Sequence, residues 1–309
     1  MSRLGIDIGG TKVALRLERN GAAVGAPAQQ TVFTWPGEGD VAADLAALAE
    51  ALATLRRPAG DPVTSVGAAL PAALDTEGRV AGWPNRPHWR GLDVRRRLAG
   101  LLPGARVRVA DDGDLAALAE ARAAGSRDLV HFGVGTGIGG GMVLDGVLRP
   151  GTARGSCEVG HIVVDHSGDA RCDCGRLGCV QALASGRATL RRAGRALGRP
   201  VGFAELRQAW ADREGWAVET VTAGASALAA AVVSVTELVH PEIVTVGGGF
   251  AAALPGYVTE VAARTEALHR PTAPAPALRP AALGALSSLD GALLLARDIG
   301  TDGPSPDRA

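Results

Sequence analysis

The chain has 309 residues and a mass of 31.2 kDa. Because domains have a modal size of about 100 to 150 residues, we expect two lobes with a cleft. Hydrophobic residues make up 47% of the chain and charged residues 21%, which excludes a mainly disordered protein. The 32 basic and 32 acidic side chains cancel. No global basic field therefore attracts nucleic acid or an anionic membrane, and we expect neither as a partner.

The amino-terminal residues and the cysteines indicate a cytoplasmic protein. The opening stretch MSRLGIDIGGTK lacks the long apolar segment of a signal peptide, and no window approaches 18 uninterrupted apolar residues. The four cysteines are packed between Cys157 and Cys179 rather than spread along the chain as a disulfide framework.

The first half predicts two strands, a helix, a strand, another strand and another helix. Apolar and other residues alternate over 4–18 on both sides of a Gly-Gly turn, a pattern typical of a β-hairpin. Residues 40–55 carry apolar side chains at helical spacing and precede a buried-strand candidate at 63–74. Residues 106–112 and 113–125 then predict a short strand and a helix.

The second half begins in the same way. Residues 129–150 predict two strands around a glycine-rich turn, followed by a tight turn at Asp145 and Gly146. A proline-rich connector at 269–280 leads to an apolar helix at 283–300, and residues 301–309 are expected to be disordered. Between these regions we expect a strand at 242–249 and helices at 185–197, 203–212 and 224–238. The repeated hairpin predicts a duplicated α/β lobe.

The turn from Asp7 to Lys12 has the chemistry of a phosphate site. Gly9 and Gly10 let backbone amides approach an anion, and Thr11 and Lys12, the single lysine of the chain, add donors. A P-loop is rejected, because here Thr precedes Lys and a strand follows. An ordinary hairpin turn remains the alternative.

Two further glycine clusters suit a nucleotide. Gly135, Thr136 and Gly137 belong to GVGTGIGGG, which matches a dinucleotide motif, but a strand rather than a helix follows. We therefore expect a second phosphate-binding turn with Thr136 as a hydroxyl donor. Gly247 and Gly248 end an apolar strand, where a base or ribose could approach closely, or where a bare strand–helix turn lies.

His161, Cys172, Cys174 and Cys179 form the pattern H-x10-C-x-C-x4-C. One imidazole and three thiolates are a closed tetrahedral ligand set for zinc. A disulfide is a poor alternative, since two cysteines separated by one residue rarely reach pairing geometry. Because four protein ligands leave no open position, we expect a structural Zn²⁺. Cys157 stands outside the set as a buried small hydrophobe.

Two aspartates follow the strand at 106–112. Asp111 and Asp112 lie at its carboxyl end, where α/β proteins bind ligands, and Asp114 could begin or cap the next helix. One carboxylate there can serve as the general base that takes a proton from a hydroxyl attacking a phosphoryl group. We assign that role to Asp112.

Together these segments resemble the ROK family of the actin and hexokinase superfamily, over nearly the whole chain. The resemblance rests on DIGGTK, Pro84–Asn85, ADDGD, GVGTGIGGG, Glu158–His161, CDCGRLGC and TVGGG. It implies an α/β, two-lobed actin-like ATPase (ribonuclease H-like) fold that closes over ATP and Mg²⁺. It also implies transfer of the γ-phosphoryl group to a sugar hydroxyl, usually that on carbon six, and favours a homodimer.

The resemblance also implies lobes and site residues. The small lobe would comprise 1–112 together with the helix 285–300, and the large lobe 113–284 with a zinc segment at 157–181. Asp112 would be the base, Asp7 would act near Mg²⁺, and His161 would contact both zinc and the sugar. The cofactor set would be Asp7, Gly9, Gly10, Thr11, Lys12, Gly135, Thr136, Gly137, Gly247 and Gly248, and the sugar set Asn85, Asp111, Asp112, Glu158, His161 and Gln181.

Three positions depart from the family pattern. Asp111 stands where the family usually has Asn, Gln181 where a glutamate is common, and Ala72 where glycine often follows proline. A carboxylate in place of an amide pairs well with a protonated amine. The departures therefore favour an amino sugar such as 3-amino-3-deoxyglucose (kanosamine), or a sugar-like cyclitol, as rivals to glucose.

Other classes of protein fit less well. A repressor of this family would carry a DNA-reading domain ahead of the phosphate hairpin, and only three residues precede Leu4. A catalytically silent sugar sensor would have lost the base or the phosphate loops, yet Asp112, Lys12 and both loops are present. ATP and polyphosphate remain alternative donors.

Overall fold

The computed structural model describes residues 2–19, 29–37, 39–56, 62–151, 155–268, 270, 272 and 276–298. The expected tail at 301–309 lies outside these residues. The chain forms two compact units. Unit 1 comprises Met1–Ala119, Thr152–Ser156 and Leu286–Ala309, and unit 2 comprises Glu120–Gly151 and Cys157–Ala285. The first break between the units falls within helix α3 (Asp112–Ala124).

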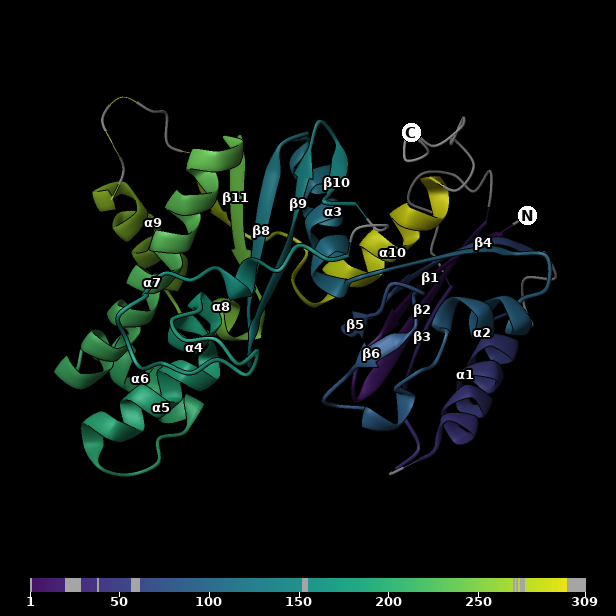
Figure 1. Ribbon diagram of the computed structural model, residues 1–309, viewed down its shortest axis with the longest axis horizontal. Coiled ribbons are helices and arrows are strands. Elements are labelled where there is room, and N and C mark those ends of the chain that lie inside the picture. Colours follow the sequence, from purple (N-terminus) through teal and green to yellow (C-terminus); the bar gives the residue numbers. More distant parts are fainter. Residues whose placement is uncertain are drawn as a thin grey trace. The chain divides into compact units, whose positions relative to one another are not determined.

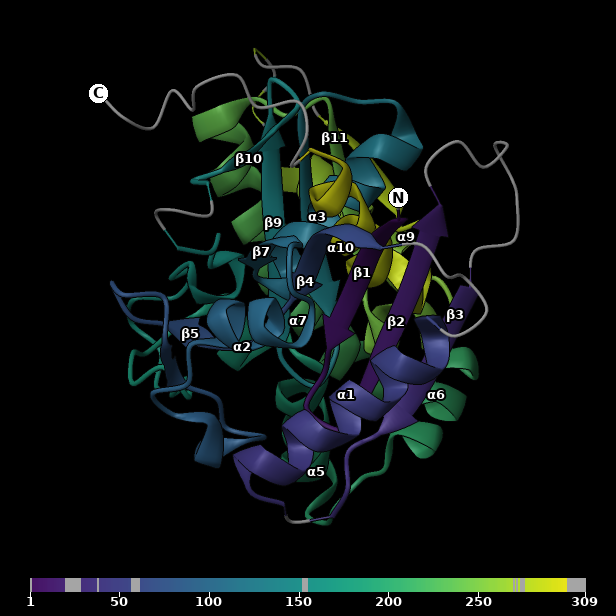
Figure 2. The ribbon, with the colours of Figure 1, turned by 90° about the vertical axis from the view of Figure 1, so that its right-hand side faces the viewer.

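Unit 1 is built on a five-stranded sheet, which Figure 2 shows nearly face-on. Its first two strands pair as the antiparallel hairpin that the alternating sequence predicts. The neighbours β1, β4 and β7 run parallel. The order is β3 (Gln29–Thr34), β2 (Lys12–Arg19), β1 (Ser2–Ile8), β4 (Val63–Ala69) and β7 (Arg106–Ala110).

Both faces of this sheet are covered by helices. On one face, α1 (Val41–Arg56) and α2 (Val94–Leu101) contribute to the core that contains Leu4 and Ile6. Helix α10 (Ser287–Asp298) packs on β1 and β4 at the opposite face (Figure 1). There the register pairs Gly5 with Gly67. A Cβ at Gly67 would lie 2.0 Å from the Ala292 carbonyl oxygen, so the helix contacts the strands backbone to backbone.

The strand expected at 63–74 is shorter than predicted. It ends at Ala69, and residues Ala73–Leu74 form β5, which pairs with β6 (Val80–Gly82) in a separate two-stranded ribbon. Pro71 lies between the two segments and has no N–H to continue the ladder. A 3-10 turn, η1 (Pro87–Trp89), follows β6 and precedes α2.

Unit 2 repeats the sheet of unit 1. The pairs β8–β9 and β9–β10 are antiparallel, whereas β8–β11 and β11–β12 are parallel. This is the same succession as in unit 1, so the predicted duplication of an α/β lobe is confirmed. The order is β10 (Val147–Arg149), β9 (Ile138–Leu144), β8 (Leu129–Val134), β11 (Ile243–Gly247) and β12 (Ala277–Pro280).

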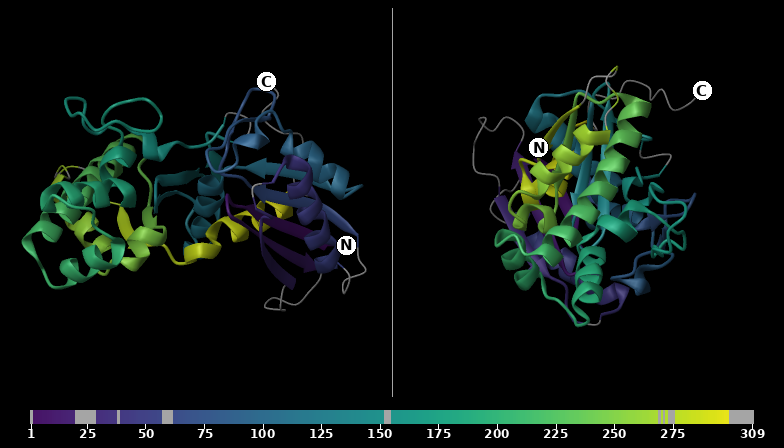
Figure 3. Two further views of the ribbon diagram at one scale, coloured as in Figure 1. Left: turned by 90° about the horizontal axis from the view of Figure 1, so that it is seen from below. Right: turned by 90° about the vertical axis from the view of Figure 1, so that its left-hand side faces the viewer.

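The helices of unit 2 gather beside this sheet (Figures 1 and 3). Two elements differ from expectation. Helix α7 begins at Gly215 rather than at 224, because tertiary packing overrides the low helix propensity of the β-branched residues before 224. Strand β12 lies within the segment that was expected to be a proline-rich connector. The helices are α4 (Val180–Ala184), α5 (Gly186–Leu197), α6 (Phe203–Ala211), α7 (Gly215–Val239), α8 (Gly249–Ala253) and α9 (Tyr257–Leu268), with 3-10 turns η2 (Val159–His161) and η3 (Gly284–Leu286).

Among the described helices, α7 is the one that is long and apolar enough to cross a membrane by length and composition. Its buried residues belong to the hydrophobic core of unit 2, where α7 packs against α4, α5, α6 and α9. These contacts are typical of the core helix of a globular protein.

Candidate functional site

The first glycine turn connects β1 to β2 and permits no larger residue. The Gly9 N–H donates to the Lys12 carbonyl oxygen over 3.0 Å. A Cβ on Gly9 would lie 2.8 Å from that oxygen, and a Cβ on Gly10 would lie 2.6 Å from the Asn85 Cβ. The structure therefore brings Asn85, expected at the sugar, against the expected phosphate turn. Thr11 and Lys12 are exposed beside it.

Two carboxylates of unit 1 lie close enough to influence each other. Burial, and then the negative charge of Asp112, raise the pKa of Asp7 from 3.8 to about 6, and the positive charge of Lys12 opposes both. Asp7 ends β1, and Asp112 begins α3 at the carboxyl end of β7. Paired carboxylates that resist ionisation together suit a divalent cation, whose charge would stabilise both.

The cap of α3 differs from expectation. Helix α3 begins after Asp111, whose carboxylate accepts from the N–H of Gly113 over 2.9 Å. Asp114 lies buried within the first turn of the helix. Because Oδ1 of Asp111 is fixed by this contact, its carboxylate has a defined orientation where β7 ends.

The second glycine turn, between β8 and β9, is held by neighbouring segments of unit 2. The Gly135 carbonyl accepts from the Gly186 N–H over 2.9 Å, at the start of α5. The Ile138 N–H donates to Oε1 of Gln181 over 3.0 Å. A Cβ at Gly137 would meet that same oxygen at 2.9 Å. The sequence led us to expect Gln181 at the sugar and gave no signal of this contact with the turn.

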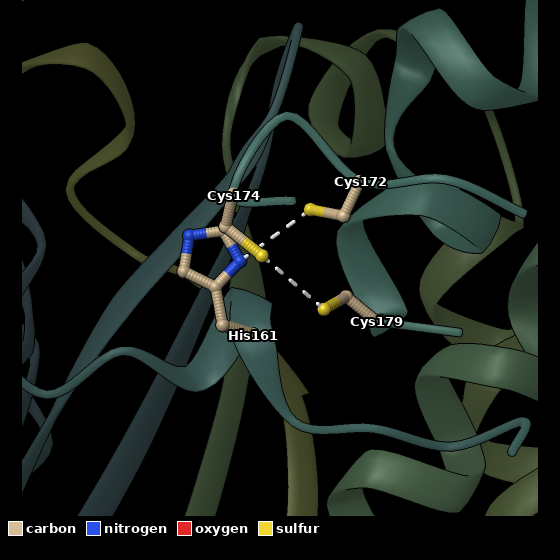
Figure 4. A group of neighbouring side chains, drawn as sticks. All are labelled: His161, Cys172, Cys174 and Cys179. Atoms are coloured by element: carbon tan, nitrogen blue, oxygen red, sulfur yellow. Dashed lines mark hydrogen bonds between the residues drawn. The ribbon is translucent and has the colours of Figure 1, made fainter. Parts of the chain in front are cut away.

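The four expected metal ligands converge in unit 2 (Figure 4). Their ligand atoms all lie within 4.8 Å of one another. Nδ1 of His161 is 3.6 Å from Sγ of Cys172, and Sγ of Cys174 is 3.6 Å from Sγ of Cys179. Tetrahedral zinc places such atoms roughly 3.6 to 3.8 Å apart. A disulfide bond would require about 2.05 Å between two sulfur atoms, so none joins Cys174 to Cys179.

The electrostatics of this cluster also suit a cation. Burial and the neighbouring sulfur atoms raise the pKa of Cys179 to about 12. Three thiolates so close together repel one another unless a cation neutralises them. Nε2 of His161 lies 3.8 Å from a carboxylate oxygen of Glu158. The two ring nitrogens thus face different groups, Nδ1 the cysteines and Nε2 the carboxylate.

The cluster is joined to the second turn through Gln181. Nε2 of Gln181 lies 3.8 Å from Sγ of Cys172, while its Oε1 holds the turn. A neutral amide can donate to a thiolate and accept from a backbone N–H at once, whereas a glutamate could only accept. Cys157 stands apart from the cluster, as expected, but it is only partly buried where it packs against the core.

An apolar hollow of about 410 Å³ opens where β11 ends. Gly247 and Gly248, which the sequence analysis expects near a nucleotide, line this hollow. Gly248 has φ +86°, and a Cβ there would lie 2.5 Å from the Val134 carbonyl oxygen. Other lining residues were not expected from the sequence, among them Leu254, Tyr257, Pro280 and Ala281.

The site residues divide between the units. Asp7, the first turn, Asn85, Asp111 and Asp112 belong to unit 1. Unit 2 contains the second turn, Glu158, Gln181, the apolar hollow and the Cys3His cluster of His161, Cys172, Cys174 and Cys179. Two sheets of identical order, each opened by a glycine-turn hairpin, define an actin-like α/β protein of two units.

Comparison with known proteins places this architecture in a family. The ROK family model matches residues 3–299, and the chain belongs to the ROK family. It is 50% identical over 294 residues to a kanosamine kinase from Amycolatopsis mediterranei, covering 95% of each chain.

Solved structures agree with this assignment. A ROK hexokinase from Thermus thermophilus has a TM-score of 0.87 and 33% identity, covering 98% of this chain and 100% of that one. A ROK family glucokinase from Streptomyces griseus, in complex with glucose and AMPPNP, has a TM-score of 0.76 and 26% identity. The match covers 96% of this chain and 100% of the glucokinase.

Proposed function

We propose that this protein is an ATP-dependent kinase that phosphorylates the 6-hydroxyl of kanosamine, 3-amino-3-deoxyglucose. The observation that carries the choice of substrate is the 50% identity to a kanosamine kinase over 95% of both chains. The choice of reaction is supported by the carboxylate of Asp7, which interacts electrostatically with both Asp112 and Lys12.

The phosphoryl donor is assigned to the glycine segments. The first turn holds phosphate oxygens through its backbone N–H groups and through Thr11 and Lys12. The second turn adds Gly135, Thr136 and Gly137. The adenine ring enters the apolar hollow beside Gly247 and Gly248. The hollow has a volume of about 410 Å³, which suits a small aromatic group. Asp7 holds Mg²⁺, which supplies positive charge to the transferring phosphoryl group.

Asp112 is the general base in this proposal. Its carboxylate accepts the proton of the sugar hydroxyl as that oxygen attacks the γ-phosphorus. Its place at the start of α3 puts it at the positive end of the helix dipole, which favours the ionised form. The pKa of its neighbour Asp7 is raised to about 6, by burial and then by the charge of Asp112.

Asp111 is proposed to select the amino sugar. Its carboxylate, held by the Gly113 N–H, offers negative charge to the protonated amine on carbon three. Asn85, Glu158, His161 and Gln181 are proposed to contact the remaining hydroxyls. A neutral hydroxyl gains less from a carboxylate than an ammonium group does, so glucose should bind more weakly.

The Cys3His cluster is proposed to hold a structural Zn²⁺ through Nδ1 of His161 and the three sulfur atoms. With four protein ligands, the metal would organise the segment from Glu158 to Gln181 and take no part in phosphoryl transfer. We further propose that the protein is a cytoplasmic homodimer.

The test is ADP release measured with glucose, mannose, N-acetylmannosamine, fructose, kanosamine, glucosamine and a cyclitol. The proposal predicts the highest kcat/KM for kanosamine. A higher value for glucose or the cyclitol would contradict the substrate assignment. No turnover with any acceptor, in protein that still binds sugar, would identify a silent sensor instead, and turnover with polyphosphate but not ATP would reassign the donor.

A further inference from the structure

The first glycine turn is held from outside its own hairpin. The Gly9 carbonyl accepts from the indole Nε1–H of Trp35 over 2.8 Å. The Gly10 carbonyl accepts from Nε of Arg86 over 3.1 Å. The Thr11 carbonyl accepts from the backbone N–H of Trp35 over 3.1 Å. Three consecutive carbonyl groups are therefore fixed by two residues that lie far from the turn in sequence.

Fixing these carbonyls also fixes the opposite side of the turn. In a trans peptide the C=O and the following N–H lie in one plane and point in opposite directions. The contacts at the Gly9 and Gly10 carbonyls thus orient the N–H groups of Gly10 and Thr11. Among the residues that the structure describes, neither of these N–H groups has a protein acceptor. These two N–H groups are therefore oriented hydrogen-bond donors, which is what an anion-binding site requires.

Arg86 is itself held rigidly. Its Nη1 donates to Oδ2 of Asp44 over 2.6 Å, and its guanidinium lies 4.6 Å from the centre of the Trp35 ring. The Arg86 side chain is 7% exposed. Because the guanidinium fork is planar, the bond to Asp44 sets the direction in which Nε meets Gly10.

Asp44 anchors the network as a fully buried carboxylate of α1. Its Oδ2 also accepts from Nε1 of Trp89 over 2.7 Å and contacts Nε2 of His88 at 2.8 Å. Within the described residues its Oδ1 has no hydrogen-bond partner. Burial opposes ionisation, but the hydrogen bonds of His88, Trp89 and Arg86 outweigh it, and the pKa of Asp44 is lowered. Burying a charged carboxylate with one unsatisfied oxygen lowers the free energy of unfolding relative to an apolar side chain, so core packing alone does not account for Asp44.

The same network contacts the segment expected at the sugar. Asn85 precedes Arg86 in sequence, and its Cβ occupies the space that a side chain on Gly10 would take. The sugar segment and the phosphate turn are thus packed together and share one support.

We propose that Asp44, Arg86 and Trp35 are positioning residues for the phosphate-binding turn. They orient the N–H groups of Gly10 and Thr11 toward the phosphates of the donor, with Asp44 acting through Arg86. The inference rests on the proposed function, since it requires that this turn bind the phosphoryl donor.

Two conservative variants test the proposal. Trp35→Phe removes the indole donor to Gly9 and keeps an aromatic ring near Arg86. Arg86→Lys keeps a positive charge for Asp44 but cannot donate to Asp44 and Gly10 through a fixed fork. The matched controls are Trp216→Phe, whose indole donates to Glu214 at the surface, and Arg79→Lys, which pairs with exposed Glu77.

The measurements are KM for ATP and for the sugar, and the shift in melting temperature caused by Mg-ATP and by adenosine. We expect each network variant to raise KM for ATP about 3- to 10-fold, as loss of one oriented hydrogen bond predicts, with KM for the sugar changing less. The shift with Mg-ATP should shrink while the shift with adenosine stays the same. The controls should match the native protein.

The outcomes separate the inference from the function on which it rests. If Mg-ATP does not stabilise the native protein, the proposed donor is wrong and the inference falls with it. If the native protein responds but both variants keep the native KM for ATP, the positioning role alone is overturned. An equal loss of the Mg-ATP and adenosine shifts would also overturn it, because a general structural defect does not discriminate between phosphate and nucleoside. Should Arg86→Lys fail to fold, Trp35→Phe still decides.

Discussion

The two glycine turns occupy equivalent places in two sheets of identical order, but they are supported by different means. The turn of unit 1 is held at its carbonyls by the side chains of Trp35 and Arg86. The turn of unit 2 is held by backbone groups at the start of α5 and by Gln181, which also contacts the Cys3His cluster. The duplicated topology thus places a glycine turn at the same position in each sheet, and each unit holds its turn through different side-chain contacts. The support of the first turn includes the buried charge of Asp44, and the support of the second turn includes a side chain that contacts the Cys3His cluster.

The change with the largest expected effect removes the proposed general base, Asp112, from unit 1. Asp112→Asn keeps the size of the side chain and a residue suited to the first turn of α3, but it cannot accept the proton. We expect kcat to fall by about 100- to 10,000-fold, the range of general-base catalysis, with sugar affinity retained. Steady-state kinetics and sugar-binding calorimetry are the measurements. Normal turnover in this variant would refute Asp112 as the base.

The corresponding change in unit 2 is the loss of one thiolate. Cys172→Ser should lose the metal and weaken the support that Gln181 gives to the second turn, because a structural zinc contributes directly to folding. We expect the melting temperature and sugar affinity to fall. Metal analysis and thermal unfolding check this, with Cys157→Ser as the control outside the cluster. A native protein that contains no zinc would contradict the assignment of the metal.

A third change tests the sheet of unit 1 alone. Gly67→Ala would place a Cβ 2.0 Å from the Ala292 carbonyl oxygen and push α10 away from the strands. Overpacking of this kind lowers the free energy of unfolding by about 1 to 3 kcal/mol. Gly82→Ala is the control, since no atom lies within 4 Å of its added Cβ. Denaturant unfolding measures both, and equal stabilities would show that α10 is not packed as described.

The smallest expected effect is a change in the pKa of Asp7. The folded protein raises the pKa of Asp7 from 3.8 to about 6, chiefly through burial and then through Asp112. A raised carboxyl pKa means that the folded state binds the proton more tightly than the unfolded state does. Asp7 therefore lowers stability as pH rises from about 4 to above 6. In Asp112→Asn this pKa should move down toward 3.8, as carboxyl NMR can show, and an unchanged pKa would refute the electrostatic contact.

The sequence predicted the parts of the fold that local patterns control. Alternation on both sides of the Gly-Gly turn gave the first hairpin, and the spacing of His161 and the cysteines gave the cluster. The elements it missed depend on distant partners. Strand β12 contains Pro280 and forms because β11 offers a parallel edge, and α7 extends to Gly215 because its apolar face is buried.

The candidate site was predictable in its residues but not in its supports. Asp7, Asp112 and the glycines stand in recognisable motifs. Neither Asp44 nor Arg86 belongs to such a motif, since their pairing arises when α1 packs beside the segment after β6. The role of Asp111 as the helix cap was also missed, because either aspartate could have begun α3.

The most direct test of the account compares Asp111→Asn with the native protein. Asparagine caps a helix as well as aspartate does, so α3 is preserved while the negative charge is removed. The measurement is the ratio of kcat/KM for kanosamine to kcat/KM for glucose. We predict a ratio that favours kanosamine in the native protein and falls about 10-fold or more in the variant, as expected when a charge-assisted hydrogen bond is lost. A native ratio that favours glucose, or a ratio unchanged by the substitution, would contradict the assignment of this protein as an amino-sugar kinase.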